Sequence, residues 1–266
     1  MNIDIPIIKN KSVQLVIITS IVLMCCAIMG IVDAIIKPSY AVKSAIKIIL
    51  FLGCPLVYSH LTKQLSLKKL FCFKKQSFFM SLFLGMGVFI VIIGTYFSLR
   101  NVLDLSGITI ALESNISVSK NNFVFVSLYI SFINSLLEEF FFRGFAFLSL
   151  KKFTSRPLAY SISSIAFALY HIAMMIGWFS IVTFVLVMIG LVVGGIIFNF
   201  LNEKNEDIYS SWMVHMFANF AINVIGFILF GIFWFITTVI CKVLTKFIDL
   251  KSYASFPWFK KWGYVA

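Results

Sequence analysis

Long apolar runs separated by short polar segments make up most of this 266-residue chain. Runs of this length predict membrane-spanning helices, because about 20 apolar residues of helix cross the hydrocarbon core of a bilayer. The expected spans are residues 13–32, 41–58, 78–99, 123–147, 158–176 and 179–200, with two more in 211–244, divided near 226–231. The pattern predicts an all-α fold: a polytopic transmembrane helical bundle of about eight helices, with an intramembrane polar site.

Composition supports the same fold class. The chain is 61% hydrophobic and only 12% charged, whereas soluble domains are roughly 45–50% apolar and about 25% charged. A net charge of +12 is also typical of nucleic-acid-binding proteins, but no nucleic-acid-binding motif accompanies the basic residues. Lysine-rich cytoplasmic loops explain the charge better. The expected partner is therefore the lipid bilayer, and nucleic acid is not expected.

Lysine positions predict the orientation of the spans. The loop after the second span contains no acid and five lysines: Lys63, Lys68, Lys69, Lys74 and Lys75. Such loops stay in the cytoplasm, and with eight spans both termini would then be cytoplasmic in a multi-pass protein of the cell membrane. Lys43 and Lys47 lie near the start of the second span, where we expect their stems to reach toward the membrane surface.

Small residues on the sixth expected span indicate close helix packing. Gly190, Gly194 and Gly195 lie along it, and glycine allows the backbone of a neighbouring helix to approach.

Two adjacent glutamates and an arginine interrupt the fourth apolar run. A charge near a bilayer centre costs on the order of 2.5–3.5 kcal/mol on insertion scales, so these residues need partners or a function. Glu139 and Arg143 are four residues apart with the acid first, which favours an ion pair on a helix. Glu138 lies about 100° further round the helix and is left to face another group. This remaining acid is the first candidate for chemistry.

Two histidines occupy other apolar runs. Phe167 precedes His171 by one turn and could wall its pocket, and Asn219 follows His215 by one turn on the same helical face. A lone buried histidine is usually a satisfied hydrogen-bonding residue, but an acid pair, two histidines and an asparagine on three spans favour a functional cluster.

Three chemistries fit this cluster. A glutamate can act as general base on water while imidazole and amide groups stabilise the oxyanion of a tetrahedral intermediate. Alternatively, Glu138, His171 and His215 could hold a divalent metal such as zinc, with an open position for water. Third, glutamate and histidine chains form proton relays in transporters. The zinc signature H-E-x-x-H and the nucleophile elbow G-x-S-x-G are both absent from the sequence.

The ordered set Glu138-Glu139-x-x-x-Arg143, Phe167-x-x-x-His171 and His215-x-x-x-Asn219 resembles the CPBP family. This family contains CaaX-type prenyl-protein endopeptidases and bacteriocin-processing or immunity proteins. The resemblance covers about residues 123–227 and implies an eight-helix intramembrane endopeptidase of the glutamate type, often classed as a metalloprotease.

The resemblance also implies roles for the matched residues. Glu138 would activate the water with His171 nearby, and His215 with Asn219 would form the oxyanion site. Glu139 and Arg143 would brace the first glutamate. We accordingly divide the chain into spans one to three (1–122), a catalytic core (123–227), and the last span with a basic tail (228–266).

The expected substrate is a small hydrophobic or lipid-associated peptide, such as a bacteriocin or pheromone precursor, or the protein acts in bacteriocin self-immunity. The alternative is a non-catalytic immunity or accessory protein that binds a peptide or a transporter. A proton-coupled transporter is less favoured, because the sequence shows no paired half-helix pattern.

Overall fold

The computed structural model describes residues 10–63, 70–72, 74–102, 105, 107–116 and 118–233. This part of the chain is helical and contains no strand. Seven of its helices are long and apolar enough to cross a membrane, which confirms the predicted polytopic helical bundle. The described residues up to Ile225 form one compact unit, and a second unit begins at Gly226. The eighth expected span and the basic tail lie almost entirely outside the described residues.

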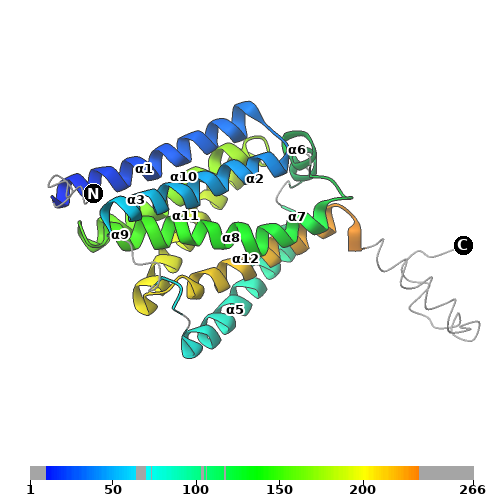
Figure 1. Cartoon of the computed structure of the whole chain (residues 1–266). Helices are drawn as coiled ribbons and strands as arrows, with labels where there is room; N and C mark the ends of the chain where they lie inside the picture. Colours follow the sequence, from blue (N-terminus) through cyan, green and yellow to red (C-terminus); the bar gives the residue numbers. More distant parts are fainter. Residues whose placement is uncertain are drawn as a thin grey trace, which may run out of the picture. The chain divides into compact units, whose positions relative to one another are not determined.

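Each of the first seven expected spans corresponds to one observed span (Figure 1). The first consists of α1 (Lys11–Ile31) and the π-helical η2 (Val32–Ile36), and the second of α2 (Tyr40–Ile48), η3 (Ile49–Gly53) and α3 (Cys54–Thr62). The third is α5 (Lys75–Leu99), and the fourth runs through α7 (Phe123–Tyr129), η4 (Ile130–Asn134), α8 (Ser135–Glu138), η5 (Glu139–Phe147) and α9 (Leu148–Leu150). The last three are α10 (Arg156–Ile172) with η6 (Ala173–Met175), α11 (Ile181–Asn205) and α12 (Tyr209–Leu229).

The fourth span is the best buried of the seven. Every residue of η5 is buried, and its phenylalanines interlock with the neighbouring helices. Phe51 of the second span stacks on Phe141 with ring centroids 4.0 Å apart, a geometry worth about 0.5–1.5 kcal/mol beyond the buried area. Helix α10 packs against both α1 and α11, so the fourth and fifth spans form the centre of the bundle.

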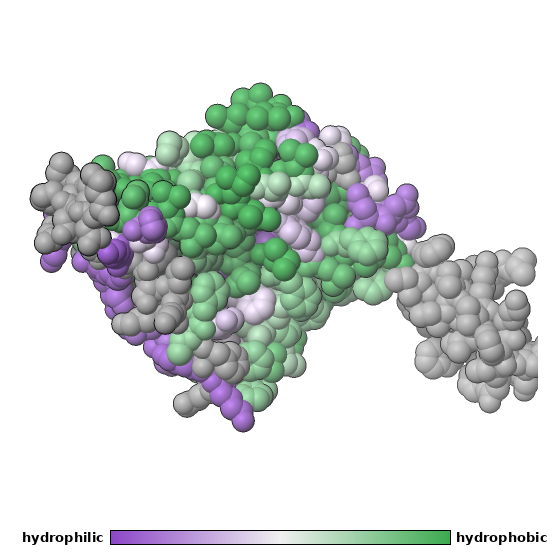
Figure 2. All heavy atoms as spheres, viewed as in Figure 1, coloured by the Kyte–Doolittle hydropathy of each residue, from purple (hydrophilic) through white to green (hydrophobic). Residues whose placement is uncertain are grey.

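Much of the surface is apolar (Figure 2). Hydrophobic side chains cover the middle of the bundle in this view, and hydrophilic ones gather toward its ends. Large side chains such as Ile35, Phe83 and Phe125 are more than 70% exposed. Soluble monomers rarely expose apolar patches larger than a few hundred Å², so this surface is suited to lipid.

The helix of the fourth span widens on both sides of Glu138. The π-helical stretches η4 and η5 flank it, and such stretches are frequent at functional sites. Side chains from α12 and α10 donate hydrogen bonds to carbonyl oxygens of this span: Asn223 to Ser127, Asn219 to Ile130, Trp212 to Phe132 and Ser163 to Phe142. Neighbouring helices therefore fix the rotation of the segment that carries Glu138.

A short helix, α6 (Gly107–Ile116), forms between the third and fourth spans. One local expectation needs correction. Close packing through glycine applies to only one of the three glycines. A Cβ atom on Gly195 would lie 3.0 Å from the Cα of Ser164, whereas a Cβ atom on Gly190 or Gly194 would meet no atom of another helix within 4 Å.

Candidate functional site

Glu138 lies inside the bundle with 2% of its surface exposed. Its Oε1 atom receives hydrogen bonds from Asn134 Nδ2 at 3.0 Å and from Lys47 Nζ at 2.5 Å. Its other oxygen, Oε2, faces His171 Nε2 at 3.9 Å and His215 Nε2 at 3.7 Å. The structure thus brings together three of the residues predicted from the sequence.

The separations between Oε2 and the two imidazoles exceed a hydrogen bond, but they suit a bridging water. A water molecule at about 2.8 Å from each atom can touch the carboxylate and a histidine at once. The site therefore has the geometry for a water held between an acid and two rings.

The hydrogen bonds of the histidines fix which ring nitrogen carries hydrogen. His171 Nδ1 lies 2.7 Å from the carbonyl oxygen of Phe167, and a carbonyl can only accept, so Nδ1 is the donor. His215 Nδ1 lies 2.8 Å from Glu139 Oε1 and donates to that carboxylate in the same way. In the neutral rings both Nε2 atoms carry lone pairs. Two imidazole acceptor atoms therefore lie within 4 Å of Glu138 Oε2, and a donor such as water suits the space between Oε2 and either ring.

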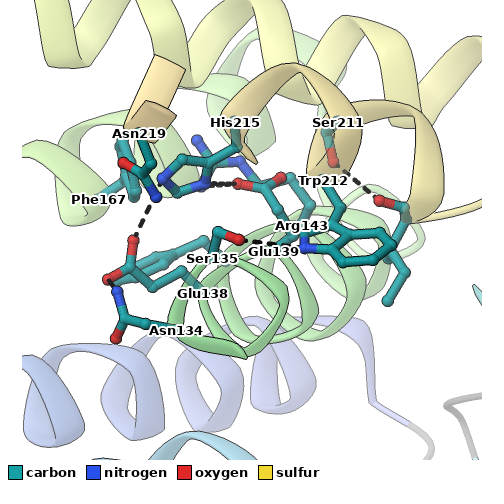
Figure 3. A network of polar contacts seen from close by, with 12 residues as sticks. Asn134, Ser135, Glu138, Glu139, Arg143, Phe167, Ser211, Trp212, His215 and Asn219 are labelled. Carbon is teal, nitrogen blue, oxygen red and sulfur yellow. Dashed lines mark hydrogen bonds and ion pairs between the residues drawn. The ribbon is translucent and has the colours of Figure 1, made fainter. Parts of the chain in front are cut away.

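The predicted ion pair between Glu139 and Arg143 is confirmed, at 3.3 Å with both side chains fully buried. Its contact with the site differs from the expected one. Glu139 Oε1 binds His215 rather than bracing Glu138 directly (Figure 3). The pair thus fixes the orientation of the His215 ring, because a carboxylate that accepts a hydrogen bond from Nδ1 sets the direction in which Nε2 points.

Aromatic rings enclose the two imidazoles. Phe167 packs edge-on against His171 at 4.8 Å, as the sequence led us to expect, and against His215 at 5.8 Å. Phe198 stacks on His215 at 5.2 Å, and Arg143 lies 4.1 Å above the ring of Phe167. Sequence reasoning missed Phe198, because nothing distinguishes it from the other phenylalanines of the apolar runs.

Asn219 lies one turn beyond His215 on α12, as predicted. Its amide donates to the carbonyl oxygen of Ile130 at 3.2 Å, so in this conformation it is engaged with the π-helical stretch η4. An oxyanion role for Asn219 stays a prediction.

Comparison with known proteins adds the family. Residues 120–221 match the family model described as type II CAAX prenyl endopeptidase Rce1-like. The chain carries an Rce1-like domain. This match confirms the resemblance to the CPBP family, and the family implies an intramembrane endopeptidase. No curated protein and no solved structure matches the chain. The division into three domains is untested and stays a prediction.

The expectation that the side chains of Lys43 and Lys47 reach toward the membrane surface is wrong. Both lysines lie outside the Rce1-like domain. Lys43 and Lys47 do not reach the membrane surface: they are 5% and 3% exposed. Lys43 pairs with Asp33 at 2.7 Å and Lys47 pairs with Glu138 at 2.5 Å. Glu138 is therefore not the unpaired acid that we expected. Asp33, the partner of Lys43, lies in the helical η2 at the end of the first span.

A signal for Lys47 was present in the sequence. It lies seven residues after Tyr40, which begins the span, or about 10 Å along the helix at 1.5 Å per residue. A lysine at that depth needs an acid in the bundle. Asn134 could have been found too, since it precedes Glu138 by one turn on the same face.

The site does not fit a metal centre. Among the residues that the structure describes, no group of three histidine, cysteine, aspartate or glutamate side chains is placed to hold a metal ion. The Lys47 ammonium already binds the Glu138 carboxylate at 2.5 Å and supplies the positive charge there.

Proposed function

We propose that this protein is an intramembrane endopeptidase in which Glu138 acts as general base on water. The observation that supports the proposal is the approach of Glu138 Oε2 to His171 Nε2 and His215 Nε2, at 3.9 and 3.7 Å, within an Rce1-like domain. The lipid-facing surface around this buried site favours a substrate that enters from the membrane.

The proposed reaction begins with a water between these three atoms. Glu138 Oε2 takes one proton from the water while His171 Nε2 accepts a hydrogen bond from its second hydrogen. The oxygen attacks the peptide carbonyl carbon and gives a tetrahedral oxyanion. Glu138 then returns its proton to the amide nitrogen, the C–N bond breaks, and an amine leaves. The acyl product is a carboxylic acid, which gives the second water proton to His171 Nε2 and leaves as a carboxylate. General acid–base groups of this kind contribute roughly 10²–10⁴-fold to the rate.

His215 and Asn219 are the proposed oxyanion site. In its protonated form, His215 would donate Nε2–H to the oxyanion while Nδ1–H stays bonded to Glu139. Asn219 would need to turn its amide away from the Ile130 carbonyl. Such donors act strongly in a site that excludes water.

The proposed substrate is a small hydrophobic or lipid-associated peptide, such as a bacteriocin or pheromone precursor. The lysine-rich loops favour an orientation with both termini in the cytoplasm. The second candidate function is a non-catalytic immunity protein that binds such a peptide. The approach of two imidazole nitrogens to one carboxylate oxygen of Glu138 favours catalysis, because simple binding of a peptide does not require it.

Cleavage of two internally quenched peptides by the purified protein in liposomes tests the proposal. One peptide is a farnesylated C-a-a-X sequence and the other is an unlipidated hydrophobic sequence. Glu138→Gln keeps the shape of the side chain but removes the base, and we expect at least about a 10²-fold loss of kcat. Glu203→Gln is the matched control, since Glu203 pairs with Lys151 and Arg156 outside the site. A folded Glu138→Gln variant with wild-type cleavage would refute the proposal.

A further inference from the structure

Lys47 joins the site from a part of the chain that the family match does not cover. The match covers residues 120–221, whereas Lys47 belongs to α2. Its ammonium contacts Glu138 Oε1 and Asn134 Oδ1, each at 2.5 Å, and lies 4.8 Å above the ring of Tyr170. The ring of Phe51 lies 5.4 Å from the same ammonium, so two acceptors and two aromatic faces surround the charge.

The burial of this lysine has consequences for the charge of Glu138. A buried ammonium without a counter-ion is strongly disfavoured, and so is a buried lone carboxylate, which neutralises itself by binding a proton. Lys47 and Glu138 are 3% and 2% exposed and in direct contact. Each therefore stabilises the charged form of the other, and a general base must be in its charged form to accept a proton.

The same contact also gives the two carboxylate oxygens of Glu138 different partners. Lys47 and Asn134 occupy Oε1, and this arrangement turns Oε2 toward His171 and His215. A carboxylate without these partners could rotate about its last bond, because that torsion has broad minima. One oxygen is thus held and the other is presented to the water position.

We propose that Lys47 is a positioning residue of the active site, which keeps Glu138 ionised and its Oε2 oxygen directed at the two histidines. This inference rests on the proposed function. It means that the Rce1-like domain is incomplete without the second span. A purely structural ion pair between α2 and the fourth span would instead affect stability and leave the chemistry unchanged.

Lys43 supplies a matched control for that structural alternative. It lies one turn before Lys47 on the same helix and is also buried. It also pairs with a buried carboxylate, that of Asp33 at 2.7 Å. Lys43→Met and Lys47→Met therefore remove equivalent charges from α2, and only the second removes a contact to Glu138.

Infrared difference spectroscopy tests the charge of Glu138 without any substrate. Compared with the wild-type protein, Lys47→Met should gain the carbonyl band of a protonated carboxylic acid. The double variant Lys47→Met/Glu138→Gln should gain none relative to Glu138→Gln alone. Absence of a Glu138-dependent band in Lys47→Met would overturn the proposal.

Peptide cleavage tests the positioning role. We expect Lys47→Met to lower kcat by about 10²-fold, the lower end of general-base contributions, with KM unchanged. Lys47→Arg keeps the charge in a different shape and should recover kcat to within about tenfold of the wild type. Lys43→Met should keep the wild-type kcat. Equal losses in the Lys43 and Lys47 variants, or none in Lys47→Met, would overturn the proposal.

The two measurements separate this inference from the proposed function. If the wild-type protein cleaves neither peptide while the infrared band behaves as expected, the proposed function fails and the ionisation of Glu138 by Lys47 stands. If Lys47→Met does not fold, Lys47→Gln takes its place, because its amide can still donate to Asn134.

Discussion

Replacement of Arg143 by methionine should strongly destabilise the protein. The arginine side chain is 0% exposed and its ion pair with Glu139 is fully buried. Removal of one partner from a buried pair typically costs about 3–5 kcal/mol, because the other charge is left without compensation. The guanidinium also lies 4.1 Å from the centre of the Phe167 ring and 5.0 Å from that of Phe198, and these contacts are lost too.

Thermal unfolding in detergent micelles, followed by circular dichroism, measures this effect. A loss of 1 kcal/mol lowers the melting temperature of a chain of this size by about 2–4 °C, so Arg143→Met should melt about 10 °C lower. The double variant Arg143→Met/Glu139→Gln should recover most of the loss, because neither charge remains. Within the described part of the chain the guanidinium nitrogens have no hydrogen-bond partner. The attraction between the two charges therefore offsets little of the free-energy cost of removing them from water.

Lys151→Met is the control for this experiment. Lys151 pairs with Glu203 at 3.2 Å, but its side chain is 37% exposed, and exposed pairs contribute about 0–1 kcal/mol. We expect little change in melting temperature. The reasoning is refuted if Arg143→Met melts within about 3 °C of the wild type, or if the double variant is no more stable than the single one.

Two further predictions concern packing and pH. Gly195→Ala should lower the melting temperature by several degrees, because the added Cβ would meet the Ser164 backbone at 3.0 Å. An overpacked contact of this kind costs about 1–3 kcal/mol. Gly194→Ala is the control and should leave the melting temperature unchanged, because Gly194 faces open space. Burial raises the pKa of Asp207, which lies between two spans, above its ordinary value of 3.8. The folded state therefore binds this proton more tightly than the unfolded state, so this group's contribution to stability is present at low pH and lost as pH rises. Asp207→Asn keeps an acceptor for Ser210 and should raise the melting temperature at pH 7, with a difference that shrinks on acidification; a constant difference would contradict the assignment.

Local sequence predicted the contacts within one helix of the candidate site but not those between helices. The pair Glu139 and Arg143 followed from helical spacing alone, since residues four apart on a helix are neighbours whatever surrounds them. Phe167 beside His171 followed for the same reason. Lys47 and Phe198 did not, because their contacts with Glu138 and His215 join different spans, and helical periodicity carries no information about which spans are adjacent.

The sequence by itself determined the bundle. Lipid excludes any spanning segment that leaves its backbone polar groups unpaired, so apolar runs of this length had to become helices, and seven of the predicted spans were found where expected. It also identified an acid, two imidazoles and a carboxamide as candidates for chemistry. Only the tertiary structure decided how they pair: Glu138 binds a lysine from the second span, and His215 takes the carboxylate of Glu139. The physical reason is that a buried charge is stabilised by whichever opposite charge the packing of helices brings to it.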